Sequence, residues 1–504
     1  MIQTLEEHAR LAGALSKRLG GSLFETHISS VIVADEHAWK IKKPLDLGFL
    51  DFSTLERRRH FCAEEIRLNS RLAPDVYQSV IAITGSADAP QLEGDDAVIE
   101  YAVQMRVFPP EGLLANHPQL LNEERMDDLA RQIVEFQREI NQAEPGSRLG
   151  SPQTVLGAMQ GNFDLLRTLV EHPGDLQRLD ALEAWTQRRY RQLRPILQQR
   201  QQQGFVGEGH GDLHLGNIVL ERDRLIIFDG IEFNQKLCWI DHVSEIAFLM
   251  MDLDHAGRTD LANCFLNRWL IYSGDFAGLE LLRFYQLYRA MVRAKVAAIR
   301  LGQQLDAGEK EQATAAYREY LSLAEHYSKS PEPLLIITSG PSGSGKSVAA
   351  RRLVATMPAI QISSDIERKR LAGLSPLARS DSGRDAGIYT PQMSVKTYRR
   401  LADVSRIVIE AGFTAVADAT FLKQAWRRPF LELAQQLGVD YRILDIQTPE
   451  EELKRRVEER LRRGDDPAEA DVDVLIRQLE TREEFSAEEL PHVIAVTDSR
   501  NFQL

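Results

Sequence analysis

Residues 210–217 read His210-Gly211-Asp212-Leu213-His214-Leu215-Gly216-Asn217, and Asp229 follows in the segment FDG at 228–230. Between them, the apolar runs NIVL and LIIF flank the polar ERDR, a pattern that predicts a β-hairpin. Asp212, Asn217 and Asp229 carry carboxylate or amide oxygens, the hard ligands that Mg²⁺ prefers. The stretch therefore predicts a polar loop, a hairpin and a second acidic loop that together form one oxygen-rich site.

The spacing D-x-x-x-x-N is typical of loops that catalyse phosphoryl transfer. Asp212 fits the catalytic carboxylate that accepts a hydrogen bond from the attacking hydroxyl, and Asn217 and Asp229 fit the metal ligands. The loop resembles that of the aminoglycoside-phosphotransferase/choline-kinase branch of the protein-kinase-like fold, which reads HGDLHxxN. The resemblance implies a bilobal α+β domain that binds ATP and Mg²⁺.

A lysine and a glutamate upstream fit the same resemblance. Ala38-Trp39-Lys40 matches the A-x-K of the third strand, which implies that Lys40 pairs with the ATP phosphates. Lys42 points to the same side of a strand and is an alternative. Glu65 lies on the apolar stripe of the following helix and is the expected ion-pair partner, with Glu64 as the alternative.

Other interpretations of this region carry less weight. His210 and His214 are four apart, as in a helical zinc pair, but Gly211 disfavours a helix there. A purely structural loop or an inactive kinase fold is also compatible with the residue types. Asp241 precedes an apolar helix and is expected to be its N-terminal cap. The metal segment FDGIEFN (228–234) differs from the IDW or LDW of the antibiotic-resistance enzymes. The residues that would select an antibiotic are not recognisable, so an aminoglycoside substrate does not follow.

A second motif begins at residue 334 with LLIITSGPSGSGKS. An apolar strand is followed by G-x-x-x-x-G-K-S, a Walker A loop whose backbone N–H groups and helix N-terminus bind phosphates. Lys346 is expected to reach the β- and γ-phosphates and Ser347 to coordinate Mg²⁺. The expected nucleotide-binding residues are Gly340, Ser342, Gly343, Ser344, Gly345, Lys346 and Ser347.

The residues after this loop resemble small P-loop kinases of the zeta-toxin, gluconate-kinase and polynucleotide-kinase groups. The D-x-x-R at Asp365 and Arg368 implies a catalytic base and a substrate-binding arginine, although Asp365 also suits a helix cap. Asp418 ends an apolar strand and is expected near Mg²⁺, and Arg427 on the next helix is expected to contact substrate.

A charged segment near the C-terminus, KRRVEERLRRGDDPAEADVDVLIRQ (454–478), resembles the arginine-bearing lid of these kinases. The resemblance implies that Arg460 and Arg463 bind the nucleotide and that one or the other stabilises charge on the transferring phosphoryl group. A solvated surface helix explains the same pattern equally well.

The expected domains are a protein-kinase-like domain at 1–327, a linker at 328–333 and an α/β P-loop domain with a parallel sheet at 334–504. The linker, SKSPEP, is short and polar, and strands alternate with helices after it. The order resembles a bacterial fusion family described as bifunctional aminoglycoside phosphotransferase/ATP-binding protein.

Composition excludes several other classes of protein. The 504 residues carry a net charge of −13, which argues against a generic nucleic-acid-binding coat. Three separated cysteines indicate neither a disulfide framework nor a thiolate zinc site and fit a reducing cytoplasm. The N-terminal residues lack the apolar core of a signal peptide, and we expect no membrane-spanning helix.

The sequence therefore predicts a cytoplasmic, bifunctional ATP-dependent kinase that phosphorylates hydroxyl groups of small molecules with Mg²⁺. A nucleotide sensor or toxin-like protein with one active domain is a second hypothesis, and a polynucleotide 5′-hydroxyl kinase in the C-terminal domain is a third. We expect small-molecule partners and neither nucleic acid nor membrane. Substrate identity and oligomeric state do not follow from these patterns.

Overall fold

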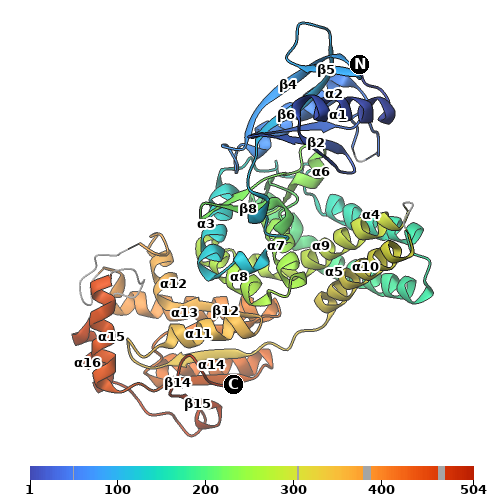
Figure 1. Ribbon diagram of the computed structural model, residues 1–504. Helices are drawn as coiled ribbons and strands as arrows, with labels where there is room; N and C mark the ends of the chain where they lie inside the picture. Colours follow the sequence, from blue (N-terminus) through green and yellow to red (C-terminus); the bar gives the residue numbers. More distant parts are fainter. Residues whose placement is uncertain (49, 303–305, 379–386, 464–470) are drawn as a thin grey trace. The chain divides into compact units, whose positions relative to one another are not determined.

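The computed structural model describes residues 1–48, 50–302, 306–378, 387–463 and 471–504. The chain forms two compact units (Figure 1). Unit 1 comprises Met1–Gly257 and Phe284–Glu325, and unit 2 comprises Arg258–Arg283 and His326–Leu504. The segment Arg258–Arg283 therefore belongs with the C-terminal part of the chain, whereas the sequence prediction placed it in the first domain.

Unit 1 begins with an antiparallel sheet in the order β1-β2-β3-β6-β4-β5. The hairpin expected near residue 35 is present, because β2 pairs with β3. The strands are β1 (Ser22–Glu25), β2 (Ser29–Ala34), β3 (His37–Lys42), β4 (Tyr77–Ser86), β5 (Ala89–Leu92) and β6 (Val98–Arg106).

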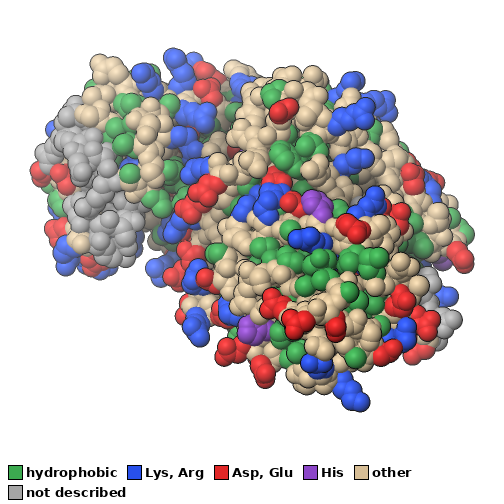
Figure 2. Space-filling view, turned by 90° about the horizontal axis from the view of Figure 1, so that it is seen from above, with side chains coloured by type: hydrophobic (Ala, Val, Ile, Leu, Met, Phe, Trp, Pro, Cys, Tyr) green, Lys and Arg blue, Asp and Glu red, His purple; other side chains and the backbone are tan. Residues whose placement is uncertain are grey.

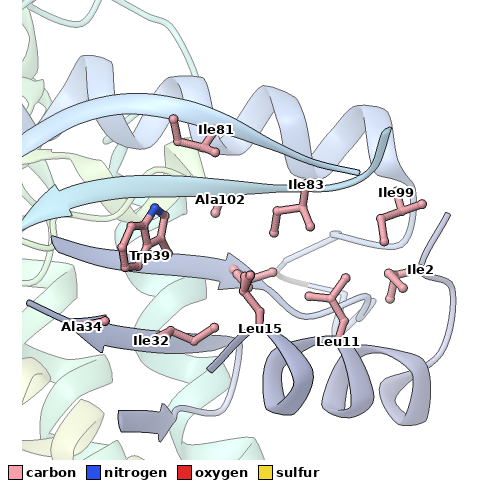
Figure 3. Packing of buried hydrophobic residues seen from close by; sticks show 11 residues of the cluster. Ile2, Leu11, Leu15, Ile32, Ala34, Trp39, Ile81, Ile83, Ile99 and Ala102 are labelled. Carbon is pink, nitrogen blue, oxygen red and sulfur yellow. The ribbon is translucent and has the colours of Figure 1, made fainter. Parts of the chain in front are cut away.

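Two helices cover the opposite faces of this sheet, α1 (Leu5–Leu19) and α2 (Leu55–Asn69). Leu11 and Leu15 of α1 pack against a cluster that includes Ala102 of β6 (Figure 3). The next residue of β6, Val103, packs with Cys62 of α2 on the other face. Successive residues of a strand face opposite sides, so β6 contributes to both cores.

The rest of unit 1 is mostly helical. Its helices are α3 (Glu123–Glu139), α4 (Pro152–Leu169), α5 (Pro173–Gln202), α6 (Gln235–Cys238), α7 (His242–His255), α9 (Leu279–Ile299) and α10 (Ala307–Ser328). The first turn of α9 belongs to unit 2, and α10 ends at the boundary with unit 2. Two short antiparallel pairs complete it: β7 (Val206–Glu208) with β10 (Trp239–Asp241), and β8 (Ile218–Glu221) with β9 (Arg224–Ile227). The β8–β9 pair is the hairpin predicted after residue 217.

Unit 2 contains a parallel sheet in the order β12-β13-β11-β14-β15. The strands are β11 (Leu335–Ser339), β12 (Ala359–Ser363), β13 (Thr414–Asp418), β14 (Tyr441–Ile446) and β15 (Val493–Val496). Its helices are α8 (Thr259–Ser273), α11 (Lys346–Thr356), α12 (Ser364–Leu371), α13 (Pro391–Glu410), α14 (Gln424–Leu437), α15 (Glu450–Arg463) and α16 (Val472–Glu480). The predicted parallel α/β sheet is confirmed.

Helix α8 covers the outer edge of strand β12. The side-chain amide of Asn267 donates to the backbone oxygen of Ala359 at 2.9 Å and accepts from the backbone nitrogen of Gln361 at 2.8 Å. Asn263 adds a hydrogen bond to the backbone oxygen of Met357 at 3.2 Å. Because β12 is an edge strand, these amides supply partners that a neighbouring strand would otherwise provide.

Among the residues that the structure describes, no helix combines the length and the apolar character needed to cross a membrane.

Candidate functional site

Two helices of unit 1, α7 and α9, form hydrogen bonds to the backbone of the loop at residues 210–217. The carboxylate of Glu245 on α7 accepts the backbone N–H groups of His210 and Gly211, at 2.7 and 3.0 Å. Asp252, also on α7, accepts from the backbone nitrogen of Leu215 at 2.9 Å. Arg289 on α9 donates to the backbone oxygen of Gly211 at 3.0 Å. The loop therefore keeps one backbone conformation without a regular helix or strand.

The two histidines of this loop act as hydrogen-bonding groups. The Nδ1 atom of His210 accepts from the backbone nitrogen of Asp212, so its Nε2 atom donates to the oxygen of Phe228 at 2.8 Å. In His214, Nδ1 accepts from the nitrogen of Gly216 and Nε2 lies 3.2 Å from the Asp212 carboxylate. Both nitrogens of each ring thus have protein partners, and a zinc pair is not supported.

Asp212, the predicted catalytic carboxylate, lies partly exposed in the loop at 210–217. Its side chain is about one-third exposed, at 35%. Burial acts to raise the pKa of Asp212, but the hydrogen bond from His214 and the attraction of His210 and Arg289 lower it to about 2. The group is therefore an ionised acceptor at neutral pH.

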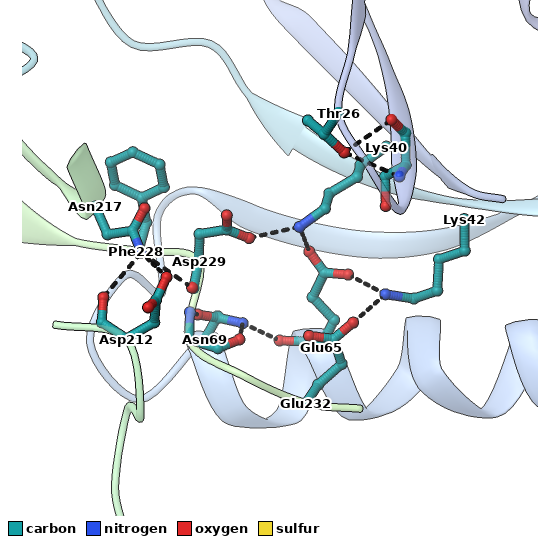
Figure 4. A network of polar contacts seen from close by, with 12 residues as sticks. Thr26, Lys40, Lys42, Glu65, Asn69, Asp212, Asn217, Phe228, Asp229 and Glu232 are labelled. Carbon is teal, nitrogen blue, oxygen red and sulfur yellow. Dashed lines mark hydrogen bonds and ion pairs between the residues drawn. The ribbon is translucent and has the colours of Figure 1, made fainter. Parts of the chain in front are cut away.

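Asn217 joins Asp212 to the second acidic loop. Its amide nitrogen donates to Asp212 Oδ2 at 3.0 Å (Figure 4). That bond leaves the amide oxygen of Asn217 as the atom available to a cation. Asp229 has a left-handed backbone, with φ of 63°, and its side chain is 43% exposed. Such a conformation is strained for a residue other than glycine and is often found at functional sites.

Lys40 and Lys42 both reach Glu65, as Figure 4 shows. Lys40 lies 2.8 Å from Glu65 Oε1, and Lys42 lies 2.6 Å from Oε2. Lys40 also contacts Asp229 at 2.5 Å, and Lys42 also contacts Glu232. The period of two along β3 places both lysines on the face that α2 covers. Glu64 instead pairs with Arg67 at 2.7 Å, so the structure brings Glu65, and not Glu64, to the lysines.

These charges control one another through burial and attraction. Burial disfavours the charged form of Lys40, but Asp229, Glu65 and Glu232 hold its pKa well above the ordinary value. Burial likewise acts against ionised Glu65, yet the two lysines lower its pKa to about 2. Burial, together with repulsion from Glu65, raises the pKa of Glu232. Lys40 and Glu65 are therefore a charged pair, as an ATP-binding lysine requires.

The donor set of unit 1 fits Mg²⁺–ATP. Asp229 and Asn217 offer exposed or unshared oxygens to a hard cation, and the Lys40 ammonium lies beside them. The predicted residues of this unit thus meet at one place.

In unit 2, the Walker A loop has the backbone that phosphate binding requires. Gly340, Gly343 and Gly345 have φ of 151°, 81° and 100°. A Cβ atom on Gly340 would lie 2.8 Å from the hydroxyl of Ser344, and one on Gly345 would lie 2.9 Å from that of Ser499. Glycine is therefore required, because a side chain would fill the phosphate cradle or strain the loop.

Two polar groups of this loop fit an anion as ligand. The Ser344 hydroxyl is buried and has no hydrogen-bond partner in the described part of the chain. Lys346 Nζ donates to the backbone oxygen of Pro341 at 2.7 Å, which keeps the ammonium folded over the loop. Ser347, the expected Mg²⁺ ligand, is exposed in the first turn of α11.

The carboxyl ends of the central strands carry the remaining predicted residues. Asp418 ends β13 opposite Ser363 of β12, and the backbone of Gly340 bonds that of Thr420 at 3.0 Å. Asp365 follows in the first turn of α12. In a parallel sheet this edge is where ligands bind, so the loop, Asp418 and Asp365 share one side.

Arg368 and Arg427 differ from each other in their freedom to bind substrate. Arg368 is mostly buried and donates to the backbone oxygen of Ile388 and the hydroxyl of Ser394. Arg427 is 1% exposed and makes a two-point ion pair with Glu489, at 2.7 and 3.0 Å. The prediction that Arg427 contacts substrate is wrong, because its guanidinium is enclosed and already paired.

Arg460 and Arg463 belong to α15, but their side chains lie outside the described residues. Their expected nucleotide contacts stay a prediction.

Several residues with a clear role in these sites were not predicted. Glu245 and Asp252 lie in the apolar helix that reads HVSEIAFLMMDLDH, and acidic residues in such a setting require buried partners. The sequence therefore does indicate that Glu245 and Asp252 have buried partners. Gln361 was not recognisable, yet its side chain donates to Asp418 Oδ2 at 2.8 Å. Asp241 does cap α7, as predicted, through the backbone nitrogen of Val243.

The fold and the two sites define a protein-kinase-like unit joined to a P-loop unit. The sheet with Lys40 on β3 and Glu65 on α2, followed by the loops at 210–217 and 228–232, is the architecture of protein-kinase-like folds. The family model described as "AAA domain" matches residues 335–485 in unit 2.

The chain belongs to the same family as the uncharacterized protein Rv2004c of Mycobacterium tuberculosis. The two are 30% identical over 405 residues, which cover 79% of this chain and 78% of the relative.

Two solved structures resemble parts of the chain. A choline kinase from Cryptosporidium parvum is 11% identical and matches 61% of this chain and 89% of its own, with a TM-score of 0.39. A sugar kinase from Janibacter sp. is 19% identical and matches 34% of this chain and 87% of its own, with a TM-score of 0.25.

Proposed function

We propose that this protein is a bifunctional ATP-dependent phosphotransferase. Each unit transfers the γ-phosphate of ATP to a hydroxyl group of a small molecule with the help of Mg²⁺. The observation that carries the proposal is that four polar residues lie close together. Asn217 bonds Asp212, and Lys40 contacts both Asp229 and Glu65. Those four groups match the parts that phosphoryl transfer needs.

In unit 1, Asp212 accepts a hydrogen bond from the acceptor hydroxyl and orients it toward the phosphate. The low pKa of Asp212 keeps it ionised, so its main contribution is positioning and late proton acceptance. Asn217 and Asp229 would hold the cation, which neutralises charge on the phosphates when it is bound. Lys40 leaves Asp229 and turns to the phosphates, while Glu65 keeps it charged and oriented.

In unit 2, the loop at 340–347 cradles the phosphates, and Lys346 moves from the Pro341 carbonyl to them. Asp418 would hold the cation together with Ser347. Asp365 serves as the acceptor for the substrate hydroxyl, and Arg368 binds substrate. Support comes from their common position at the carboxyl edge of the sheet.

The test uses the full chain and variants that disable one unit at a time. Asp212→Asn keeps the shape of the carboxylate but removes its charge, and Lys346→Ala removes the ammonium of the P-loop. Each should leave ATP binding at the other unit intact. ATP consumption is measured against a panel of hydroxyl-bearing metabolites, and Asp212→Asn should lower turnover by unit 1 by about 10²- to 10⁴-fold.

A matched control is Asp223→Asn, which changes a carboxylate with an exposed side chain in the hairpin after the loop. It should leave turnover unchanged. If the wild-type chain binds no Mg²⁺–ATP, or if neither Asp212→Asn nor Lys346→Ala changes ATP consumption, the proposed function is wrong.

A further inference from the structure

A line of alternating charges crosses the site of unit 1. It runs from Asp229 to Lys40, Glu65, Lys42 and Glu232 (Figure 4). Phosphoryl transfer as proposed above uses the first three members. The function of the last two is not explained by that reaction.

Lys42 and Glu232 are too enclosed to contact a nucleotide. Their side chains are 1% and 4% exposed, and Lys42 also lies over the ring of Phe52, at 4.9 Å from its centre. An ion pair removed from water to this degree gives little net stability compared with apolar packing. Breaking it, however, leaves an uncompensated charge beside Glu65. The loss of either Lys42 or Glu232 is therefore expected to change the electrostatic environment of Glu65, which Lys42 contacts.

Glu232 belongs to the same short loop as Asp229. That loop is also fixed by Asn69 of α2, which accepts from the nitrogen of Gly230 at 2.6 Å. The backbone nitrogen of Asp229 donates to the hydroxyl of Tyr77 at 3.0 Å. Through Lys42, Glu232 ties the far end of the loop to strand β3 and to Glu65.

Charge balance shows what the pair does. Glu65 has one negative charge to share between two ammonium groups, Lys40 and Lys42. Glu232 supplies Lys42 with a carboxylate of its own. Without that charge, Lys42 would draw more strongly on Glu65, and Lys40 would depend on Asp229, the residue that must bind the cation.

We propose that Lys42 and Glu232 form a positioning pair that keeps Asp229 available to Mg²⁺ and keeps Glu65 available to Lys40. The proposal rests on the proposed function of unit 1. Neither residue touches the nucleotide. Both act through Glu65 and through the loop that carries Asp229.

The experiment measures ATP binding by calorimetry in the full chain carrying Lys346→Ala, so that binding by unit 2 is reduced equally in every sample. Glu232→Gln and Lys42→Met are compared with this parent, with Mg²⁺ and with a chelator. Each single variant should weaken binding about tenfold or more when Mg²⁺ is present, and less than about twofold without it. Such a tenfold change corresponds to about 1.4 kcal/mol.

The double variant Lys42→Met/Glu232→Gln removes both charges together. It should bind Mg²⁺–ATP within about threefold of the parent, because no unpaired charge then remains beside Glu65, and Asn69 and Tyr77 still hold the loop that carries Asp229. A pair that only stabilised the fold would instead weaken binding equally with and without Mg²⁺.

Glu100→Gln is the matched control. Glu100 pairs with Arg58 at 2.9 Å, both side chains are fully buried, and Arg58 lies on α2 like Glu65. This variant should lower the thermal midpoint while the ratio of binding with and without Mg²⁺ stays at the parent value. A control that loses Mg²⁺ dependence as the Glu232 variant does would overturn the proposal.

The outcomes separate the two levels of inference. If the parent binds Mg²⁺–ATP but the single variants keep its Mg²⁺ dependence, the positioning role is wrong and the proposed function stands. If the parent shows no Mg²⁺-dependent ATP binding, the proposed function of unit 1 is wrong, and the positioning role is overturned with it.

Discussion

Replacing Asn267 by leucine tests whether α8 completes the sheet of unit 2. Leucine has a similar size but removes the hydrogen bonds to Ala359 and Gln361 of strand β12, at 2.9 and 2.8 Å. One backbone carbonyl and one backbone N–H then lose their partners at a nearly enclosed position, since Asn267 is 8% exposed. Each buried group left unpaired costs about 1–3 kcal/mol. With partial compensation from the apolar side chain, we expect a net cost of about 2–4 kcal/mol.

Hydrogen–deuterium exchange measures this cost where it arises. Because the chain has two units, one global unfolding curve would not isolate β12. A loss of about 3 kcal/mol should speed exchange of the Gln361 amide by about 10²-fold. Gln361 also bonds Asp418 through its side chain, so ATP binding by unit 2 should weaken as well.

Thr259→Ala, at an exposed position of the same helix, is the control and should leave exchange in β12 unchanged. The reasoning fails if Asn267→Leu exchanges at the wild-type rate in residues 359–363. It would also fail if the control and Asn267→Leu accelerated exchange equally.

Three further predictions follow from other contacts. Arg427→Met removes the cation that neutralises the enclosed carboxylate of Glu489, which keeps only the two hydrogen bonds from Ser486. Urea unfolding of unit 2 should therefore show a loss of about 3–5 kcal/mol, part of it regained in Arg427→Met/Glu489→Leu. Loss of activity at full stability would instead restore a substrate role. Gly340→Ala places a Cβ 2.8 Å from the Ser344 hydroxyl, and nucleotide titration should show at least tenfold weaker ATP binding by unit 2. Unchanged affinity would contradict the proposal that the loop at 340–347 binds the phosphates. The pKa of Glu65 is lowered from 4.5 to about 2, so its contribution to stability is complete above about pH 4.5 and is lost as the pH falls toward 2. The free energy of unfolding should therefore be smaller at pH 3 than at pH 5. Glu65→Gln should lack the part of this pH dependence that Glu65 causes.

Local patterns predicted much of the fold and the short motifs within it. Alternation along residues 37–42 placed Lys40 and Lys42 on one face, and the structure puts both against α2. The apolar runs before Gly340 and up to Asp418 each form a strand, β11 and β13. These features depend on residues close together in the chain, so the sequence displays them directly.

Contacts between distant residues were harder to predict. Nothing near Arg427 shows that Glu489 will enclose it, because the pair forms only when the end of the chain folds back onto α14. For the same reason the sequence offers Lys40 and Lys42 as alternatives and does not show that both lysines share Glu65. The assignment of Arg258–Arg283 to unit 2 likewise depends on amides of α8 that meet β12 in space and not in sequence.

The position of α8 in the chain also bears on how the protein is made. A ribosome releases this helix before it has synthesised any strand of the sheet that the helix covers. Its apolar side chains, among them Phe265 and Trp269, are buried in the finished protein. During synthesis these side chains lack their final surroundings, because α11 and β12, against which α8 packs, are made later. The interval between the synthesis of α8 and that of β12 is therefore a stage at which the nascent chain is exposed to aggregation.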